Sequence, residues 1–220
     1  CVSRTLRTLH VTATGSADAG ANLSAFTWTL PNLTDLMLDV ATCPPLVAPN
    51  LQRISLVGLP LSVCVRVLKP AASTLRSIRL SALPKPTDTE QNELVAAIKD
   101  TKFAALEHFD FGIEHALTDA FCRAAVWPRL RTLRITLLLA SNGMPVAVQA
   151  LLSHAPLIED CDVRVHRSLS TRNSEHKERV CPSKPTVTLA RLARLRLDVS
   201  DVCVKLATAL TTCRDMTDRR

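Results

Sequence analysis

The chain has 220 residues, of which 47% are hydrophobic and only 3% aromatic, and its formal net charge is +7 at pH 7. No apolar run approaches the roughly 18 residues that a membrane-spanning helix needs, which argues against a membrane protein of that kind. The scarcity of aromatic residues argues against a surface that stacks nucleic-acid bases, although the basic charge by itself permits binding to phosphate. Because tyrosine is absent and other rings are few, we expect an aliphatic core.

A short hydrophobic phrase returns eight times: Leu or Ile, two variable residues, an apolar residue, one variable residue and a second apolar residue. The copies are Leu6–Val11, Leu33–Leu38, Leu51–Leu56, Leu75–Leu80, Leu106–Phe111, Leu130–Ile135, Ile158–Val163 and Leu192–Leu197. The apolar residues alternate within each copy, which predicts a strand with one buried face. The copies begin 18 to 34 residues apart, and a unit repeated at such spacing predicts an array in which each unit packs on its neighbours.

The segments between the phrases carry signals of helices or loops. The first helix signal is the capping-box spacing of Thr87 and Glu90. The second is Thr118 and Asp119, which precede a stretch with Phe121, Cys122 and Val126 that Pro128 ends. Pro145 fits the first turn of a third helix, and Ser200 can be the N-cap of a fourth. Residues 12–21 are typical of a loop, and residues 62–68 fit either a strand or a helix. The predicted fold class is therefore α/β, with a curved parallel sheet on the concave side and helices and loops on the convex side.

The repeated phrase, over about residues 4–212, resembles the leucine-rich repeat family in its irregular, ribonuclease-inhibitor-like form. Segments such as Trp127–Ile135 and Ala155–Ile158 are similar to the repeats of fungal F-box proteins. Many leucine-rich repeats place Asn or Cys eight residues after the first Leu, and this ladder is absent here, so the turns must satisfy their backbone in another way. The resemblance implies one solenoid domain over residues 1–213, with an exposed polar insertion at 166–188 and a charged tail at 214–220.

The variable positions between the apolar residues are expected to face the concave side of the sheet. The position between the last two apolar residues of the phrase is called the middle position. In the fourth to eighth copies it carries Arg79, Asp110, Arg134, Asp162 and Arg196, so the sign of the charge alternates. Neighbouring strands lie about 4.8 Å apart, which would place each Arg beside an Asp in a charge ladder. Two interpretations stay open: mutual neutralisation that keeps the strands in register, or a polar grip for a charged protein segment.

The candidate binding residues share an outward position in the predicted strands. They are Asp35, Met37, Arg53, Arg79, His108, Asp110, Arg134, Asp160, Asp162, Arg164, Arg194 and Arg196. Binding hot spots favour Trp, Tyr or Arg, so the arginines are the strongest candidates here, with Met37 as an adaptable apolar contact. The expected pairing with aspartates argues against nucleic acid on this face. If nucleic acid does bind, the segment Arg167–Lys184 is the better candidate.

The sequence offers little support for a metal site or for catalysis. Glu107, His108, Asp110, Glu114 and His115 form the most metal-like cluster, but zinc needs three or four converging ligands and His115 lies past the expected strand. The chain has no GxSxG motif, no P-loop, no GxGxxG motif and no Cys with a His at a known catalytic spacing. We therefore expect a protein that is not an enzyme and that needs no cofactor or metal.

The resemblance to fungal F-box proteins implies a protein-interaction scaffold. In that family the repeats select a substrate for ubiquitination and an F-box docks the ligase adaptor; here an F-box would have to precede Cys1. The eight cysteines are scattered without a CxxC pair, which indicates an intracellular protein, cytoplasmic or nuclear. The alternative is a secreted or surface leucine-rich-repeat protein, supported by the triplets Asn22–Ser24 and Asn32–Thr34 and by the even number of cysteines.

Overall fold

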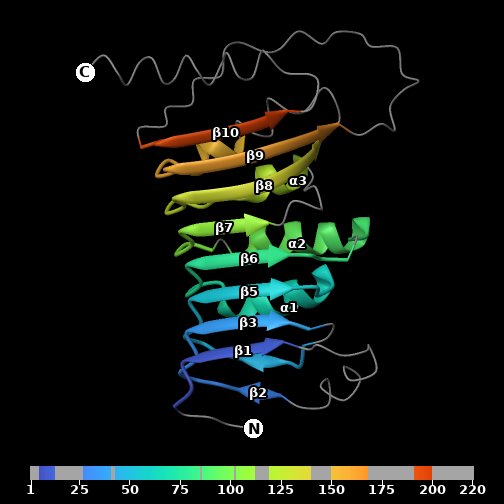
Figure 1. Ribbon diagram of the computed structural model, residues 1–220, viewed down its shortest axis with the longest axis vertical. Helices are drawn as coiled ribbons and strands as arrows, with labels where there is room; N and C mark the ends of the chain where they lie inside the picture. Colours follow the sequence, from blue (N-terminus) through green and yellow to red (C-terminus); the bar gives the residue numbers. More distant parts are fainter. Residues whose placement is uncertain are drawn as a thin grey trace.

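Figure 1 shows the computed structural model, which describes residues 5–12, 27–40, 43–84, 86–101, 103–111, 119–139, 150–167 and 191–199. Its centre is an eight-stranded parallel sheet with neighbours in the order β1-β3-β5-β6-β7-β8-β9-β10. These strands are β1 (Thr8–Thr12), β3 (Asp35–Asp39), β5 (Arg53–Val57), β6 (Ser77–Ser81), β7 (His108–Phe111), β8 (Thr132–Leu139), β9 (Asp160–Arg167) and β10 (Arg194–Val199). Every repeated phrase therefore forms one strand, which confirms the predicted strands and the α/β class.

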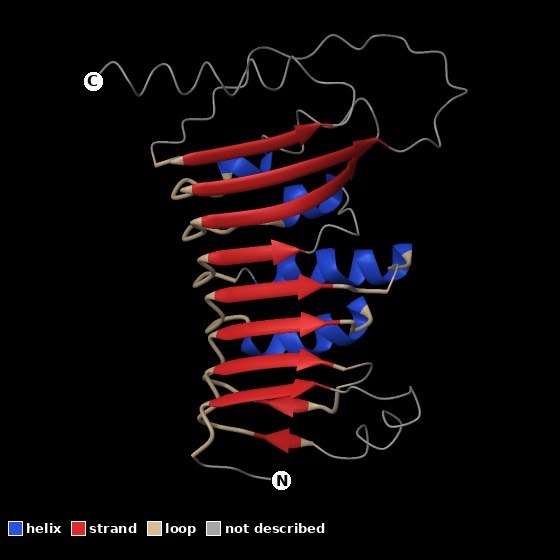
Figure 2. Cartoon of the chain, in the orientation of Figure 1, coloured by secondary structure: helices blue, strands red, loops and turns tan. Residues whose placement is uncertain are grey.

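The helices lie on one face of the sheet, as Figure 2 shows. They are α1 (Leu61–Ala71), α2 (Asp88–Thr101) and α3 (Asp119–Ala124), and α1 decides the ambiguous segment 62–68 in favour of a helix. On the same side, Trp28 and Leu46 of a two-stranded sheet, β2 (Trp28–Thr29) and β4 (Leu46–Val47), pack against the core. No helix in the described ranges is long and apolar enough to span a membrane. The other sheet face, which no described helix covers, is called the open face below.

The strand register aligns the phrases position by position. Leu36 lies opposite Ile54, Ile54 opposite Ile78, and Leu133 opposite Cys161. These inward side chains are at most 3% exposed. Stacking them removes a continuous apolar layer from water, and each buried Leu or Ile contributes roughly 1.5–3 kcal/mol to folding. The core therefore lies between the sheet and the helices, and the alternate side chains of each strand point to the open face.

One hydrogen-bond pattern joins all seven pairs of neighbouring sheet strands. The carbonyl oxygen of the residue after the first Leu or Ile of a phrase accepts from two successive N–H groups of the next unit. Gln52, for example, accepts from the N–H groups of Arg76 at 2.8 Å and Ser77 at 3.0 Å, and Arg131 accepts from Glu159 at 2.8 Å and Asp160 at 2.9 Å. Because this fork recurs without a shift, each unit enters the sheet in the same register.

A turn with a buried anchor precedes five of the phrases. The N–H of the first Leu or Ile donates to the carbonyl oxygen three residues earlier, as in Leu33 to Leu30 at 3.1 Å and Leu130 to Trp127 at 3.1 Å. The anchor residues are all buried, and they are Leu30, Ala48, Phe103, Trp127 and Ala155. The repeating unit therefore begins three residues before the phrase seen in the sequence.

The expectation of a purely aliphatic core is wrong around β7. Phe109 has its ring centroid 4.7 Å from that of Trp127 and 5.7 Å from that of Phe121, and Phe111 stacks 6.4 Å from Phe109. Phe103 is buried as well, at 3% exposure. Composition counts rings along the whole chain, and it could not show that the few rings present gather in one layer.

A single carboxylate connects the first two helices. Glu90 Oε2 accepts the backbone N–H of Thr87 at 3.0 Å, and Thr87 Oγ1 accepts the N–H of Glu90 at 3.2 Å, which confirms the predicted capping box. Glu90 Oε1 also accepts the N–H of Ser62 at 3.3 Å and its hydroxyl at 3.0 Å, in the first turn of α1. The Thr87 N–H, followed by Ser62, lowers the pKa of Glu90 below its usual value.

Three further expectations change in detail. Helix α3 ends at Ala124, before Pro128, and Val126 is 45% exposed, because Trp127 instead enters the core as a turn anchor. Strand β9 continues through Arg167, so it includes the first two residues of the expected polar insertion. Leu59 and Leu83 stand where Asn or Cys would form a ladder, and both are buried in the core.

Several expected features lie outside the described residues. They are the loop at residues 13–21, most of the insertion at 168–188, the tail at 214–220, and the helix starts at Thr118, Pro145 and Ser200. Residues 150–153 are helical, and Leu151 and Leu152 are each 1% exposed. This agrees with the helix expected after Pro145.

Candidate functional site

The structure places all twelve candidate binding residues in strands of the large sheet. On β3 to β9, their positions alternate with buried core residues. Asp35 and Met37 lie on β3, Arg53 on β5 and Arg79 on β6. The remaining eight occupy the last four strands: His108 and Asp110 on β7, Arg134 on β8, Asp160, Asp162 and Arg164 on β9, and Arg194 and Arg196 on β10. The candidates therefore form a continuous field of side chains on the open face.

The register confirms the predicted order of charges along the middle of the open face. Asp110 lies between Arg79 and Arg134, and Asp162 lies between Arg134 and Arg196. The ion pair between Arg79 Nε and Asp110 Oδ2, at 3.8 Å, crosses directly between neighbouring strands as expected. Opposite charges in such cross-strand contacts contribute roughly 0.2–1 kcal/mol.

The rest of the ladder departs from the prediction. Arg134 Nη2 lies 4.0 Å from Oδ2 of Asp160, diagonally across, and not beside Asp162. Asp162 Oδ1 instead lies 4.0 Å from Nε of Arg164 in its own strand. An arginine side chain is long enough to reach several carboxylates around it, so strand register alone does not predict which one it pairs with.

Asp160 is the centre of this charged network. In addition to Arg134, it attracts Arg194, whose Nη1 atom lies 3.6 Å from Asp160 Oδ2. Two guanidinium groups therefore share one short carboxylate. Arg196, two residues further along β10, makes no ion pair with any residue in the described ranges.

The first half of the open face holds one tight pair. Arg53 Nε donates to Asp35 Oδ1 across β3 and β5, and Thr34 Oγ1 donates to Asp35 Oδ2 at 2.7 Å. The hydrogen bond from Arg53 lowers the pKa of Asp35 below its ordinary value, with Thr34 assisting. The two charged candidate residues of these strands are thus in contact, and Asp35 stays ionised at neutral pH.

The structure also contains a second row of alternating charges that was not predicted from the sequence. It runs along the edge where the strands begin, with Arg76 Nη1 3.6 Å from Glu107 Oε1 and Arg131 Nη1 3.2 Å from Glu159 Oε1. The signal was present in the sequence, because the residue after the first Leu or Ile of each phrase alternates in sign over these four units. This edge ladder borders the open face.

The proposed metal-like cluster is only partly described. Glu107 and Asp110 are engaged by Arg76 and Arg79, and His108 lies between Ser77 and Thr132 in the register. Among the residues that the structure describes, no three His, Cys, Asp or Glu side chains could hold one ion together. Glu114 and His115 lie outside those ranges.

The buried cysteines are poorly suited to nucleophilic chemistry. Burial raises the pKa of Cys43 to about 11 and of Cys161 to about 12, and the pKa of Cys64 also rises to about 12. A thiol with such a pKa is protonated at neutral pH, whereas the thiolate is the nucleophile. These three cysteines act as small apolar residues of the core.

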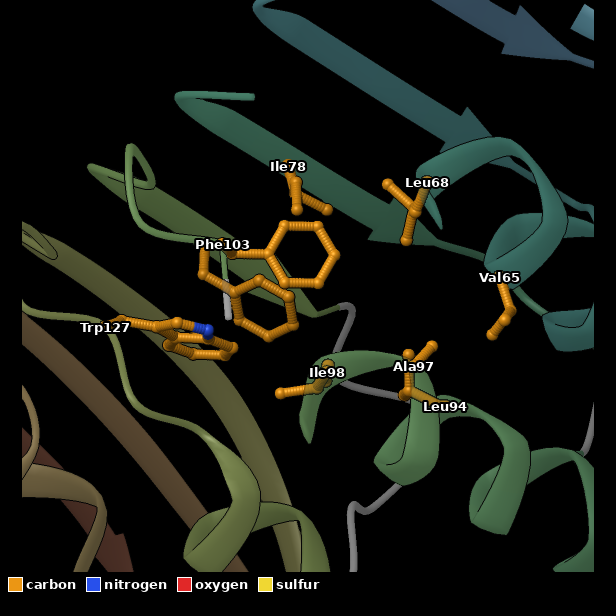
Figure 3. Close-up of a pocket in the computed structure, with 9 residues that line it drawn as sticks. Val65, Leu68, Ile78, Leu94, Ala97, Ile98, Phe103 and Trp127 are labelled. Atoms are coloured by element: carbon orange, nitrogen blue, oxygen red, sulfur yellow. The ribbon is translucent and has the colours of Figure 1, made fainter. Parts of the chain in front are cut away.

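One cavity lies between the sheet and the helices, as Figure 3 shows. Side chains of α1 and α2 face the rings of Phe103 and Trp127 across it. Its volume is about 10 Å³, and even one water molecule needs about 10–15 Å³. The cavity is therefore a small packing gap and offers no room for a substrate.

The open face is not uniformly exposed. Thr136 occupies an outward position of β8 opposite Arg164, yet it is 1% exposed, and its hydroxyl has no hydrogen-bond partner among the described residues. Thr136 therefore lies on the open face as expected, but its side chain is buried there.

Comparison with known proteins adds no relative: the chain matches no protein-family model, no curated protein and no solved structure. The geometry of the open face must therefore carry the functional interpretation. This geometry consists of exposed charged side chains at regular positions on a parallel sheet.

Proposed function

We propose that this chain is an irregular leucine-rich-repeat solenoid that serves as a protein-interaction scaffold and binds a protein partner on its open face. The observation that carries this proposal is the repeated unit itself. Seven identical hydrogen-bond forks hold eight strands in register, and the inward residues of β3 through β9 with described burial are buried. The outward residues of the same strands form a field of charged and polar side chains, which is the arrangement that a solenoid uses for binding.

A more specific role follows from the resemblance to fungal F-box proteins. The repeats would be the substrate-recognition region of a ubiquitin-ligase receptor, and an F-box in a preceding segment would dock the ligase adaptor. The protein would then act in the cytoplasm or nucleus. The buried free thiols of Cys43, Cys64 and Cys161 support a reducing compartment, where thiols persist.

A second candidate is a secreted or surface leucine-rich-repeat protein. One observation favours it: Asn32 of the triplet Asn32–Thr34 is exposed in a turn, where a glycan could be accommodated. A thiol count under denaturing, non-reducing conditions separates the two candidates. We expect free thiols throughout, and disulfides together with a glycan on Asn32 would instead support the secreted protein.

Binding through the open face is tested by affinity purification of the full-length protein from its native cells. The face variant carries Arg134→Glu and Arg194→Glu, and the control carries Lys99→Glu on the exposed side of α2. We expect the partner to be retained by wild type and control and to be lost from the face variant. The ligase adaptor should remain with all three proteins. A partner retained by the face variant would contradict binding on the open face.

A further inference from the structure

We propose that the partner segment is an acidic, extended peptide whose carboxylates are held by the arginines of β6 to β10. This inference rests on the proposed function, and it names the chemistry of what binds there. The first support is that the positive and negative groups on the open face lie at different heights above the sheet. The arginine side chains of Arg79, Arg134 and Arg194 are 65%, 54% and 74% exposed, whereas their partners Asp110 and Asp160 are 35% and 27% exposed.

The separation has a simple cause, because aspartate is short and arginine is long. The carboxylates lie close to the sheet, and the guanidinium groups stand above them. Opposite charges are nearly balanced in number on these strands, but an approaching partner meets the cationic layer first. Arg196 adds a guanidinium that has no ion-pair partner in the described part of the chain. The outer layer therefore attracts anions.

The arginines are oriented but still able to bind. Their distances to the aspartates are 3.6–4.0 Å, longer than the roughly 2.7–2.9 Å of a strong charge-assisted hydrogen bond. A guanidinium has five N–H donors, and a single distant carboxylate leaves most of them for a ligand. Asp160 holds Arg134 and Arg194 near each other, which reduces the side-chain entropy that binding would otherwise cost.

The spacing of the arginines predicts the spacing of the ligand's acidic residues. Arg79, Arg134 and Arg196 share the middle outward position on alternate strands β6, β8 and β10. Strands about 4.8 Å apart put these positions about 9.6 Å apart. A polyproline-II chain rises about 3.1 Å per residue with three residues per turn, so every third side chain returns to one side after about 9.3 Å. We infer a peptide that crosses the strands with an acidic residue at every third position.

Nucleic acid fits this surface less well. The described outward positions of β6 to β10 carry no Phe, Tyr or Trp, the large rings on which bases stack best. The aspartates beneath the arginines would also repel a continuous phosphate backbone, whereas separated carboxylates of a peptide can avoid them. An acidic protein segment is therefore the better match.

Fluorescence anisotropy with synthetic peptides tests the inference on the folded protein. The probe is a labelled, end-blocked peptide with three aspartates at every third position, separated by Ala-Pro pairs. One control peptide places the same three aspartates side by side, and another replaces them with asparagine. We expect the spaced peptide to bind at least about 10-fold more tightly than the asparagine peptide at low salt, since only the spaced peptide can form three ion pairs with the arginines.

Single variants identify the residues responsible. Arg79→Ala, Arg134→Ala and Arg196→Ala should each weaken binding of the spaced peptide by about 3–5-fold, and Lys99→Ala should leave it unchanged. These side chains lie on the surface, and circular dichroism will show that each variant remains folded. Equal loss in the Lys99→Ala control would mean non-specific attraction to a basic protein and would overturn the inference.

Two comparisons between peptides also test the acidic-segment inference. The inference would be overturned if the clustered peptide, or the asparagine peptide, bound as tightly as the spaced peptide. Tighter binding of an oligouridine probe with a steep salt dependence would overturn it in favour of nucleic acid. If no acidic peptide binds while the native partner still requires Arg134 and Arg194, only the acidic-segment inference fails. If the native partner ignores both arginines, the scaffold proposal fails by its own test.

Discussion

The first strands of the large sheet (β1, β3 and β5) and the last (β6 to β10) both pack aliphatic residues inward but differ on the open face. Leu36 and Leu56 in the first group are buried as fully as Leu133 and Val163 in the second. On the open face, the described outward residues of the first group form one ion pair, whereas those of the second group form four, two of which share Asp160. Stacking therefore constrains the inward positions in every unit, and the outward positions are left to differ.

The largest test of this comparison places a charge in each core. Leu133→Asp should lower the free energy of unfolding by at least about 4 kcal/mol, because it buries a carboxylate without a partner between stacked strands. Leu36→Asp should cost a similar amount, since both residues are at most 3% exposed. Urea unfolding followed by circular dichroism measures both. Arg134→Ala is the control; if it destabilised the protein as much as Leu133→Asp, the assigned strand face would be wrong.

The next test concerns the cluster of aromatic rings around Phe109 of β7. Among the described residues, no such cluster lies behind β1, β3 and β5. Phe109→Ala should cost about 3–5 kcal/mol, because it leaves a cavity among the rings of Phe111, Phe121 and Trp127. Leu56→Ala is the matched change in the first group and should cost less. Urea midpoints compare the two variants, and an equal cost would show that the rings add nothing beyond an ordinary core residue.

A smaller effect is expected where Glu90 connects α1 and α2. Its pKa is lower in the folded protein than the value of about 4.3 in an unfolded chain. Its contribution to stability is therefore full above about pH 5 and is lost as the pH falls through the folded pKa. Glu90→Gln should cost about 0.5–2 kcal/mol at pH 7, and the difference from wild type should shrink below about pH 4.

Glu93→Gln, in an exposed position of the same helix, is the matched control for that experiment. Thermal or urea unfolding between pH 3 and 8 measures all three proteins. A constant gap between wild type and Glu90→Gln over this range would contradict the role of the ionised carboxylate.

The smallest expected effects separate the two possible partners of Arg134. A double-mutant cycle between Arg134 and Asp160 should give a coupling of about 0.2–1 kcal/mol, as exposed ion pairs usually do. The cycle between Arg134 and Asp162, directly opposite in the register, should give a smaller value because that pair is not within ion-pair distance. A larger coupling to Asp162 would restore the simple ladder and remove the central role of Asp160.

Local pattern was enough to predict the strands, their inward faces and the capping box of α2. The alternation in Leu130–Ile135 exposes one side of a strand to the core wherever it stands, so all eight strands could be located. The spacing of Thr87 and Glu90 likewise acts within one turn of a helix. The twelve candidate residues were placed correctly on the open face for the same reason, since strand geometry sends alternate side chains to opposite sides.

Contacts between side chains of different units could not be predicted from local sequence pattern. The choice of Asp160 over Asp162 by Arg134, the second hydrogen bond of Glu90 to Ser62, and the meeting of Phe109 with Trp127 join residues that are 18 or more positions apart. Long side chains reach several neighbours of nearly equal energy, and only their positions in the folded chain select one. Local alternation of apolar residues therefore sets the repeating strand and what it buries, whereas the folded arrangement of the units selects which of their charges and rings come together.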